Sequence, residues 1–137
     1  MIQITLTDKQ AQLLSRACEF YARVYMGQFT EIPFELLNIA LSSDDYCERR
    51  DKADELLLEA RKYIYPDLNG RGHSYGIGKF ETADRIWDVY QAIREIFGDK
   101  RGSFSYYKLP EVVHFQREDE QDIDNSKTSW CYDDKLR

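Results

Sequence analysis

The sequence predicts a mainly helical α+β domain, in which a four-helix cluster lies beside a small antiparallel sheet. Apolar residues recur at helical spacing in four stretches, which are bounded by capping residues, glycine or proline. Apolar and polar residues instead alternate over residues 2–6, and segments near 103–116 are rich in aromatic and β-branched residues, as strands are. With 137 residues, 42% of them hydrophobic, the chain is long enough to bury one core.

The first two predicted elements are a strand and a helix. The alternation over residues 2–6 indicates a half-buried strand, which we expect to pair with one of the later strands. Thr7 and Gln10 have the spacing of a capping box, so a helix should begin between them and run to about Met26. Gly27 can adopt the left-handed conformation that ends a helix.

Two further helices are predicted between Thr30 and Pro66. The shorter one begins after Thr30, and we expect its apolar residues to be well buried: Ile32, Leu36, Leu37, Ala40 and Leu41. Pro33 falls in its first turn, where the missing N–H is not needed. Residues 42–45 supply a turn and an N-cap for a helix over about 46–64, which Pro66 ends. That helix has one apolar face, made of Ala53, Leu56, Leu57, Ala60, Tyr63 and Ile64.

A fourth helix is predicted over about 80–97, closed by Gly98. Its apolar stripe comprises Ala83, Ile86, Trp87, Tyr90, Ile93 and Phe97. The strands near 103–116 follow, interrupted by Pro110. We therefore predict a single globular domain over residues 1–117 and an acidic tail over 118–137, which lacks apolar periodicity as disordered segments do.

Charge and composition exclude several classes of protein. The chain has 19 Lys and Arg residues against 25 Asp and Glu, and the net charge of −6 argues against direct nucleic-acid binding. No apolar run approaches the roughly 20 residues of a membrane span, and no signal peptide is recognisable, so we expect a soluble cytoplasmic protein. Cys18, Cys47 and Cys131 fit neither a disulfide framework nor a zinc site. We find no catalytic motif, and we predict no enzymatic activity, metal or cofactor.

The most unusual segment is the loop over residues 66–79, which holds four of the seven glycines. It also carries Arg71, His73, Tyr75 and Lys79, which together suit a small phosphorylated ligand. The arginine and lysine can bind phosphate oxygens, the histidine can donate a hydrogen bond, and the tyrosine can stack on a base. The spacing matches neither a P-loop nor the dinucleotide fingerprint. The alternative is an ordered connection between two helices, with its glycines at positive φ and Tyr75 packed inward.

Two pairs of carboxylates occur at helical i, i+4 spacing. These are Glu55 with Glu59, and Asp84 with Asp88. Such pairs can bind a metal or move protons when other ligands converge on them, but the chain has only two histidines. We interpret both pairs as solvated charged faces, because they lie beside apolar stripes.

Surplus aromatic residues indicate a surface for a partner. Tyr106 and Tyr107 are adjacent, so in a strand one of them must face away from the core. Trp130 and Tyr132 form an aromatic island within the acidic tail, which either docks on the body or anchors a partner. We regard these four residues as candidates for partner binding, and homo-oligomer formation remains open.

Four short segments carry a resemblance to a known group of proteins, and the first of them is Ile-Thr-Leu-Thr at 4–7. Ala-Arg-Val-Tyr-Met-Gly-Gln-Phe at 22–29, Ser-Tyr-Gly-Ile-Gly at 74–78 and Trp-Asp-Val-Tyr-Gln-Ala-Ile-Arg at 87–94 resemble small uncharacterised proteins encoded by bacteriophages and prophages. The resemblance covers residues 1–97 and implies a phage accessory protein in a bacterial cytoplasm. We expect a non-enzymatic protein that binds and inhibits a host macromolecule, most simply a host protein, in host takeover or anti-defence. The alternative is a protein that sequesters a nucleotide signal through the loop over 66–79.

Overall fold

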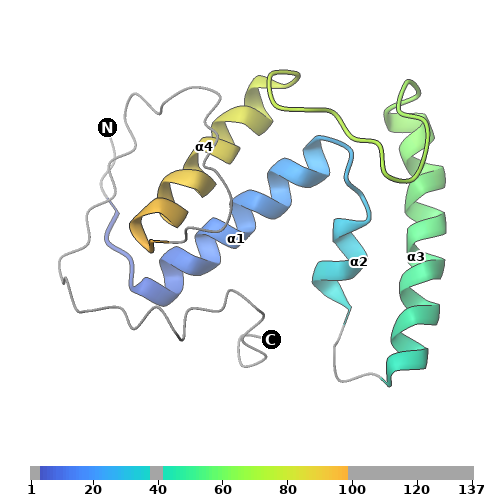
Figure 1. The fold of residues 1–137 in the computed structure, drawn as a ribbon, viewed down its shortest axis with the longest axis horizontal. Coiled ribbons are helices and arrows are strands. Elements are labelled where there is room, and N and C mark those ends of the chain that lie inside the picture. Colours follow the sequence, from blue (N-terminus) through green and yellow to red (C-terminus); the bar gives the residue numbers. More distant parts are fainter. Residues whose placement is uncertain (1–3, 38–41, 99–137) are drawn as a thin grey trace.

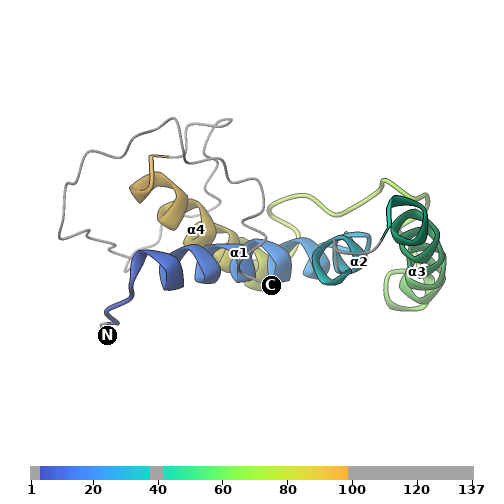
Figure 2. The same ribbon diagram turned by 90° about the horizontal axis from the view of Figure 1, so that it is seen from below.

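The computed structural model describes residues 4–37 and 42–98. Within these ranges the chain forms four helices: α1 (Asp8–Tyr25), α2 (Glu31–Leu36), α3 (Ser43–Ile64) and α4 (Glu81–Ile96). Helix α4 lies along α1, and α3 stands on the far side of α2 (Figure 1). The view from below shows the same order, with α2 between α1 and the end-on α3 (Figure 2). The connection from α3 to α4 therefore crosses back over the molecule.

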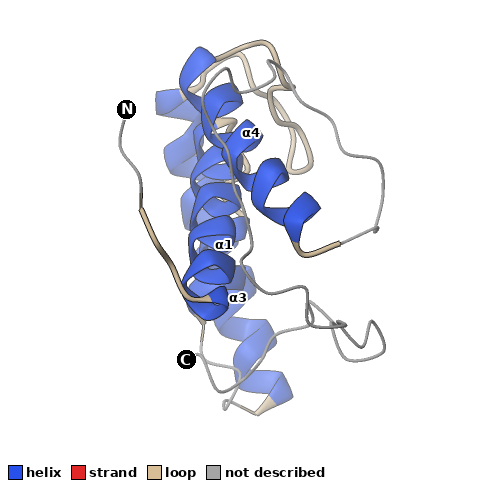
Figure 3. Cartoon of the chain, turned by 90° about the vertical axis from the view of Figure 1, so that its left-hand side faces the viewer, coloured by secondary structure: helices blue, strands red, loops and turns tan. Residues whose placement is uncertain are grey.

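The predicted antiparallel sheet is wrong for the described part of the chain, which contains helices and loops but no strand (Figure 3). Residues 4–7 form no strand, and Ile4 is 72% exposed. A strand is stable only when a second strand satisfies its backbone groups, and an alternation of five residues does not supply that partner. The predicted strands near 103–116, the domain boundary at 117 and the tail over 118–137 lie outside the described residues.

The sequence signals at the helix ends are confirmed. Thr7 and Gln10 form a complete capping box, in which the Gln10 N–H donates to Thr7 Oγ1 and the Thr7 N–H donates to Gln10 Oε1. The Ser42 hydroxyl oxygen accepts the N–H of Asp45 at the start of α3. Helix α3 ends at Ile64, directly before the residue that precedes Pro66. Local chemistry thus determines where these helices begin and end.

The core lies between α1 and α4. Ala22, Met26 and Ala83 are buried together, and their small or unbranched side chains let the two helices approach closely. Aromatic and aliphatic side chains surround this cluster: Tyr25, Tyr75, Phe80, Ile86 and Trp87. Further along α4, Ile93 is fully buried. The predicted inward stripe of this helix is therefore correct.

The prediction that the apolar residues of α2 are well buried is wrong in part, and much of the apolar face of α3 is exposed. On α2, Pro33 is buried, but Leu36 is 71% exposed. On α3 the buried residues are Asp54 and Arg61, while large residues of the predicted apolar face are exposed: Leu56 at 63%, Tyr63 at 84% and Ile64 at 58%. Periodicity identifies an apolar face correctly, but which face packs depends on the neighbouring elements.

Gly27 occupies a position that only glycine fits well. Its φ is +89°, and a Cβ built there lies 2.5 Å from Leu68 Cδ1. We expect Gly27→Ala to lower the free energy of unfolding by about 2–3 kcal/mol, because left-handed strain adds to the displacement of a buried leucine. Chemical denaturation measures this loss.

Gly98 provides the matched control. Its φ is +64°, but a Cβ there meets no atom of the described residues within 4 Å. Gly98→Ala should therefore cost only the backbone strain, about 1 kcal/mol. Equal losses in the two variants would contradict the role assigned to the close approach of Leu68.

Candidate functional site

Arg61 joins three segments of the chain at the C-terminal end of α3. Its Nη1 donates to the carbonyl oxygens of Gly27, at 3.0 Å, and of His73, at 2.9 Å, and its Nη2 donates to the carbonyl oxygen of Gly70. The residue is only 3% exposed. A guanidinium has enough N–H groups in a fixed plane to hold several carbonyls at once, so Arg61 fixes the turn after α1 and the 70–73 segment to α3.

Every partner of the Arg61 guanidinium is a neutral carbonyl. Among the described residues no carboxylate lies within ion-pair distance of it, and its Nε–H is buried without an acceptor. A buried charge normally has a counter-charge, because desolvation costs several kcal/mol per ion. The cation therefore retains unused capacity for an anion.

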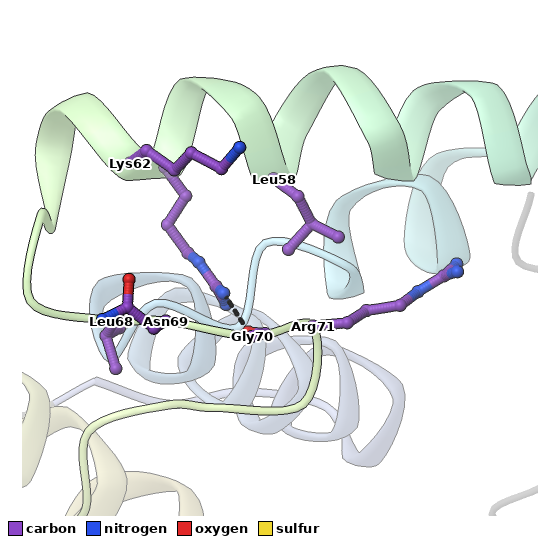
Figure 4. Close-up of a pocket in the computed structure, with 7 residues that line it drawn as sticks. Leu58, Lys62, Leu68, Asn69, Gly70 and Arg71 are labelled. Carbon is purple, nitrogen blue, oxygen red and sulfur yellow. Dashed lines mark hydrogen bonds between the residues drawn. The ribbon is translucent and has the colours of Figure 1, made fainter.

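A pocket of about 240 Å³ opens beside this arginine. Figure 4 shows it between α3, which contributes Leu58 and Lys62, and the chain from Leu68 to Arg71. Two leucines line it, and its other lining residues are Arg61, Lys62, Asn69, Gly70 and Arg71. The pocket thus combines apolar walls with three cationic residues, and none of the described residues that line it is acidic.

Of the four residues predicted to bind a phosphorylated ligand, only Arg71 lines this pocket. Its Nη2 donates to Oδ2 of Asp54 at 2.7 Å, and the Asp54 carboxylate is buried on α3. His73 is exposed, and its ring lies over Gly70. His73 takes part in the site through its backbone, because its carbonyl oxygen accepts a hydrogen bond from Arg61.

Tyr75 and Lys79 lie on another part of the loop. The Tyr75 ring packs edge-on against Tyr65 and Phe80, and its hydroxyl donates to Oδ1 of Asp67 at 2.6 Å. That hydrogen bond raises the pKa of Tyr75 to about 12 and lowers the pKa of Asp67. The Lys79 ammonium lies 5.2 Å from the centre of the Tyr75 ring.

These contacts agree with the alternative interpretation of an ordered connection between helices. Gly70 and Gly78 adopt positive φ, and the Tyr75 N–H donates to the carbonyl oxygen of Met26. Ligand binding by the set of Arg71, His73, Tyr75 and Lys79 stays a prediction. The pocket instead contains Arg61 and Lys62, which sequence reasoning missed because charged residues near a helix end are usually solvated.

The interpretation of the carboxylate pairs is correct for Glu55 and Glu59, which are exposed, and wrong for Asp84 and Asp88, which are buried. Oδ1 of Asp84 accepts the N–H of Gly78 at 2.9 Å, while its Oδ2 is buried without a hydrogen-bond partner in the described part of the chain. Asp84 therefore fixes the end of the loop to the first turn of α4. The burial of this pair was missed because a carboxylate that caps a loop has the same helical spacing as a solvated one.

The remaining sequence predictions fall partly outside the described residues. Tyr106, Tyr107, Trp130 and Tyr132 are not among them. Within residues 4–37 and 42–98, no cluster of His, Cys, Asp and Glu is arranged to hold a metal ion. None of the helices there is both long and apolar enough to span a bilayer. Comparison with family models, curated proteins and solved structures finds no match to this chain.

Proposed function

We propose that this chain is a non-enzymatic accessory protein that binds and inhibits a protein of a bacterial host, as the resemblance to bacteriophage and prophage proteins implies. The observation that supports it best is the α3 stripe, which we define as Leu56, Ala60, Tyr63 and Ile64. All four residues are exposed, although three of them are large and apolar.

The stripe has the geometry of a helix-docking surface. Residues spaced by three, four and seven share one helical face, so these four side chains cover two turns of α3. Ala60 lies between Leu56 and Tyr63 in sequence, and its side chain is the smallest of the four. Exposed tyrosine next to leucine supplies contact area with little loss of side-chain entropy.

The charges around the stripe favour a protein over a nucleic acid as the partner. Lys52 pairs with Glu55 at 3.0 Å, and Lys62 pairs with Glu59 at 2.6 Å. Phosphate backbones are bound by surfaces with an excess of cations, whereas these two lysines are each matched by an acid. A partner with an apolar groove and charges of both signs at its rim is complementary to this face.

Photo-crosslinking in the bacterial host tests this proposal. A photoreactive amino acid at position 56 or 63 should capture the same host protein, and one at Thr82, an exposed position on α4, should not. Leu56→Glu should weaken binding to the captured protein by about thirtyfold and abolish its inhibition, because it places a charge in the centre of the contact.

The stability of Leu56→Glu provides the control, since an exposed substitution should change the free energy of unfolding by less than about 0.5 kcal/mol. Capture of a second copy of the chain from positions 56 and 63 would contradict the proposal, because the stripe would then be a dimer interface. Equal capture from Thr82 would contradict it as well.

A further inference from the structure

We propose that the pocket beside Arg61 binds a phosphate-type oxyanion. The site lies between the C-terminal part of α3 and residues 68–71 (Figure 4). It is separate from the α3 stripe, because α3 contributes Leu58, Arg61 and Lys62 to the pocket, and none of these is a stripe residue. The inference therefore does not depend on the function proposed above.

Arg61 supplies the main attraction. It is a nearly fully buried cation that donates to three carbonyl oxygens, and within residues 4–37 and 42–98 it meets no carboxylate and its Nε–H has no acceptor. An oxyanion in the pocket provides both missing elements, a negative charge and an acceptor oxygen. Hydrogen bonds between a guanidinium and a phosphate are charge-assisted and stronger than those to neutral groups.

Two more cations line the pocket, with side chains that are largely exposed. Lys62 lies along α3 toward Leu58 (Figure 4), while Arg71 extends from the loop and reaches Asp54 of the same helix. Arg71 is anchored by its ion pair with Asp54, whereas the partner of Lys62 is an exposed glutamate three residues away on the same helix. Lys62 is thus the cation that can turn to a ligand at the smaller cost.

The size of the pocket selects among anions. Sites that enclose drug-sized ligands measure about 300–1,000 Å³, and this pocket is smaller, at about 240 Å³. It therefore suits a phosphate group or free phosphate, and a nucleotide would extend beyond it. Arg61, which has no counter-charge among the described residues, and Lys62, whose partner is exposed, favour a dianion over a monocarboxylate.

Titration with inorganic phosphate tests the site in the full chain, at an ionic strength held constant with sodium chloride. We expect saturable heat release in calorimetry and a rise in the melting temperature. Lys62→Ala should weaken phosphate binding about tenfold, the effect of losing one charge-assisted contact. Tighter binding of a nucleoside monophosphate than of phosphate identifies a phosphate group on a larger ligand, and equal binding identifies the free ion.

Lys52→Ala is the matched control. Lys52 lies on the same helix, pairs with a glutamate three residues away and is as exposed as Lys62, but it does not line the pocket. The Lys52→Ala variant should bind phosphate with the same affinity as the unmodified chain. The proposal is overturned if phosphate gives no saturable binding, or if Lys52→Ala weakens it as much as Lys62→Ala. The Leu56→Glu variant, which changes the α3 stripe and not the pocket, should bind phosphate with unchanged affinity. The proposed protein binding and the proposed phosphate binding can therefore fail independently.

Discussion

Arg61→Met is expected to lower the free energy of unfolding by about 3–5 kcal/mol, because three hydrogen bonds from a charged donor, each worth about 1.5–3 kcal/mol, are lost, while the cost of burying the unpaired charge is relieved. Methionine retains most of the volume of the side chain but none of its N–H groups. The carbonyl oxygens of Gly27 and His73 then lose this donor, and that of Gly70 keeps only the His73 N–H, at 3.4 Å; buried carbonyls without a good donor are costly. Chemical denaturation followed by circular dichroism gives the difference.

Arg85→Met controls for the general effect of removing an arginine. Arg85 lies on α4, its side chain is 64% exposed, and it pairs with Glu81 within the same helix. Its loss should change the free energy of unfolding by less than about 0.5 kcal/mol. If Arg61→Met also cost less than about 1 kcal/mol, Arg61 would not be the residue that holds the three segments together.

Ile93→Ala is the second large expected effect, a loss of about 3 kcal/mol. Ile93 is fully buried on α4, the helix that packs along α1, so truncation removes apolar contacts and leaves a cavity. A domain of this size is stable by only about 5–15 kcal/mol, so the melting temperature should fall clearly. Thermal and chemical denaturation both measure the change.

Ile64→Ala is the control. It makes the same change at an exposed helix position, so it shows how much of the stability loss of Ile93→Ala comes from burial and how much from helix propensity. Ile64 lies in the last turn of α3 and is 58% exposed, so Ile64→Ala should alter the free energy of unfolding by no more than about 0.5 kcal/mol. A loss there as large as that of Ile93→Ala would contradict the exposure of the α3 stripe, because it would mean that Ile64 is covered in solution.

Local signals in the sequence predict the helices well. The capping box of Thr7 and Gln10, the Ser42 cap and Pro66 each act within a few residues, so their effects are readable without knowledge of the fold. The prediction of a strand at the start of the chain is wrong because a strand, unlike a helix end, is not determined by signals within a few residues. A strand depends on a distant partner, and the side-chain alternation of residues 2–6 is the same whether or not that partner exists.

The candidate site could be predicted only in part, because its main residue has no local signature. The glycine-rich loop is visible in the sequence, and Arg71 does line the pocket. Arg61, by contrast, precedes Lys62 in the last turn of a helix, where cations usually complement the helix dipole in water. Its burial depends on carbonyls that lie 9, 12 and 34 residues away in sequence.

The pairing of the first and last described helices has a consequence for folding kinetics. Helix α1 ends at Tyr25 and α4 begins at Glu81, so their contact closes a loop over residues 26–80. Closing a flexible loop of that length costs roughly 3.5 kcal/mol in chain entropy before any contact across it is gained. Helical proteins with mainly local contacts fold fastest, and the contact order here is raised by this closure. The folding rate should therefore depend on how early α2, α3 and the Arg61 contacts shorten the loop.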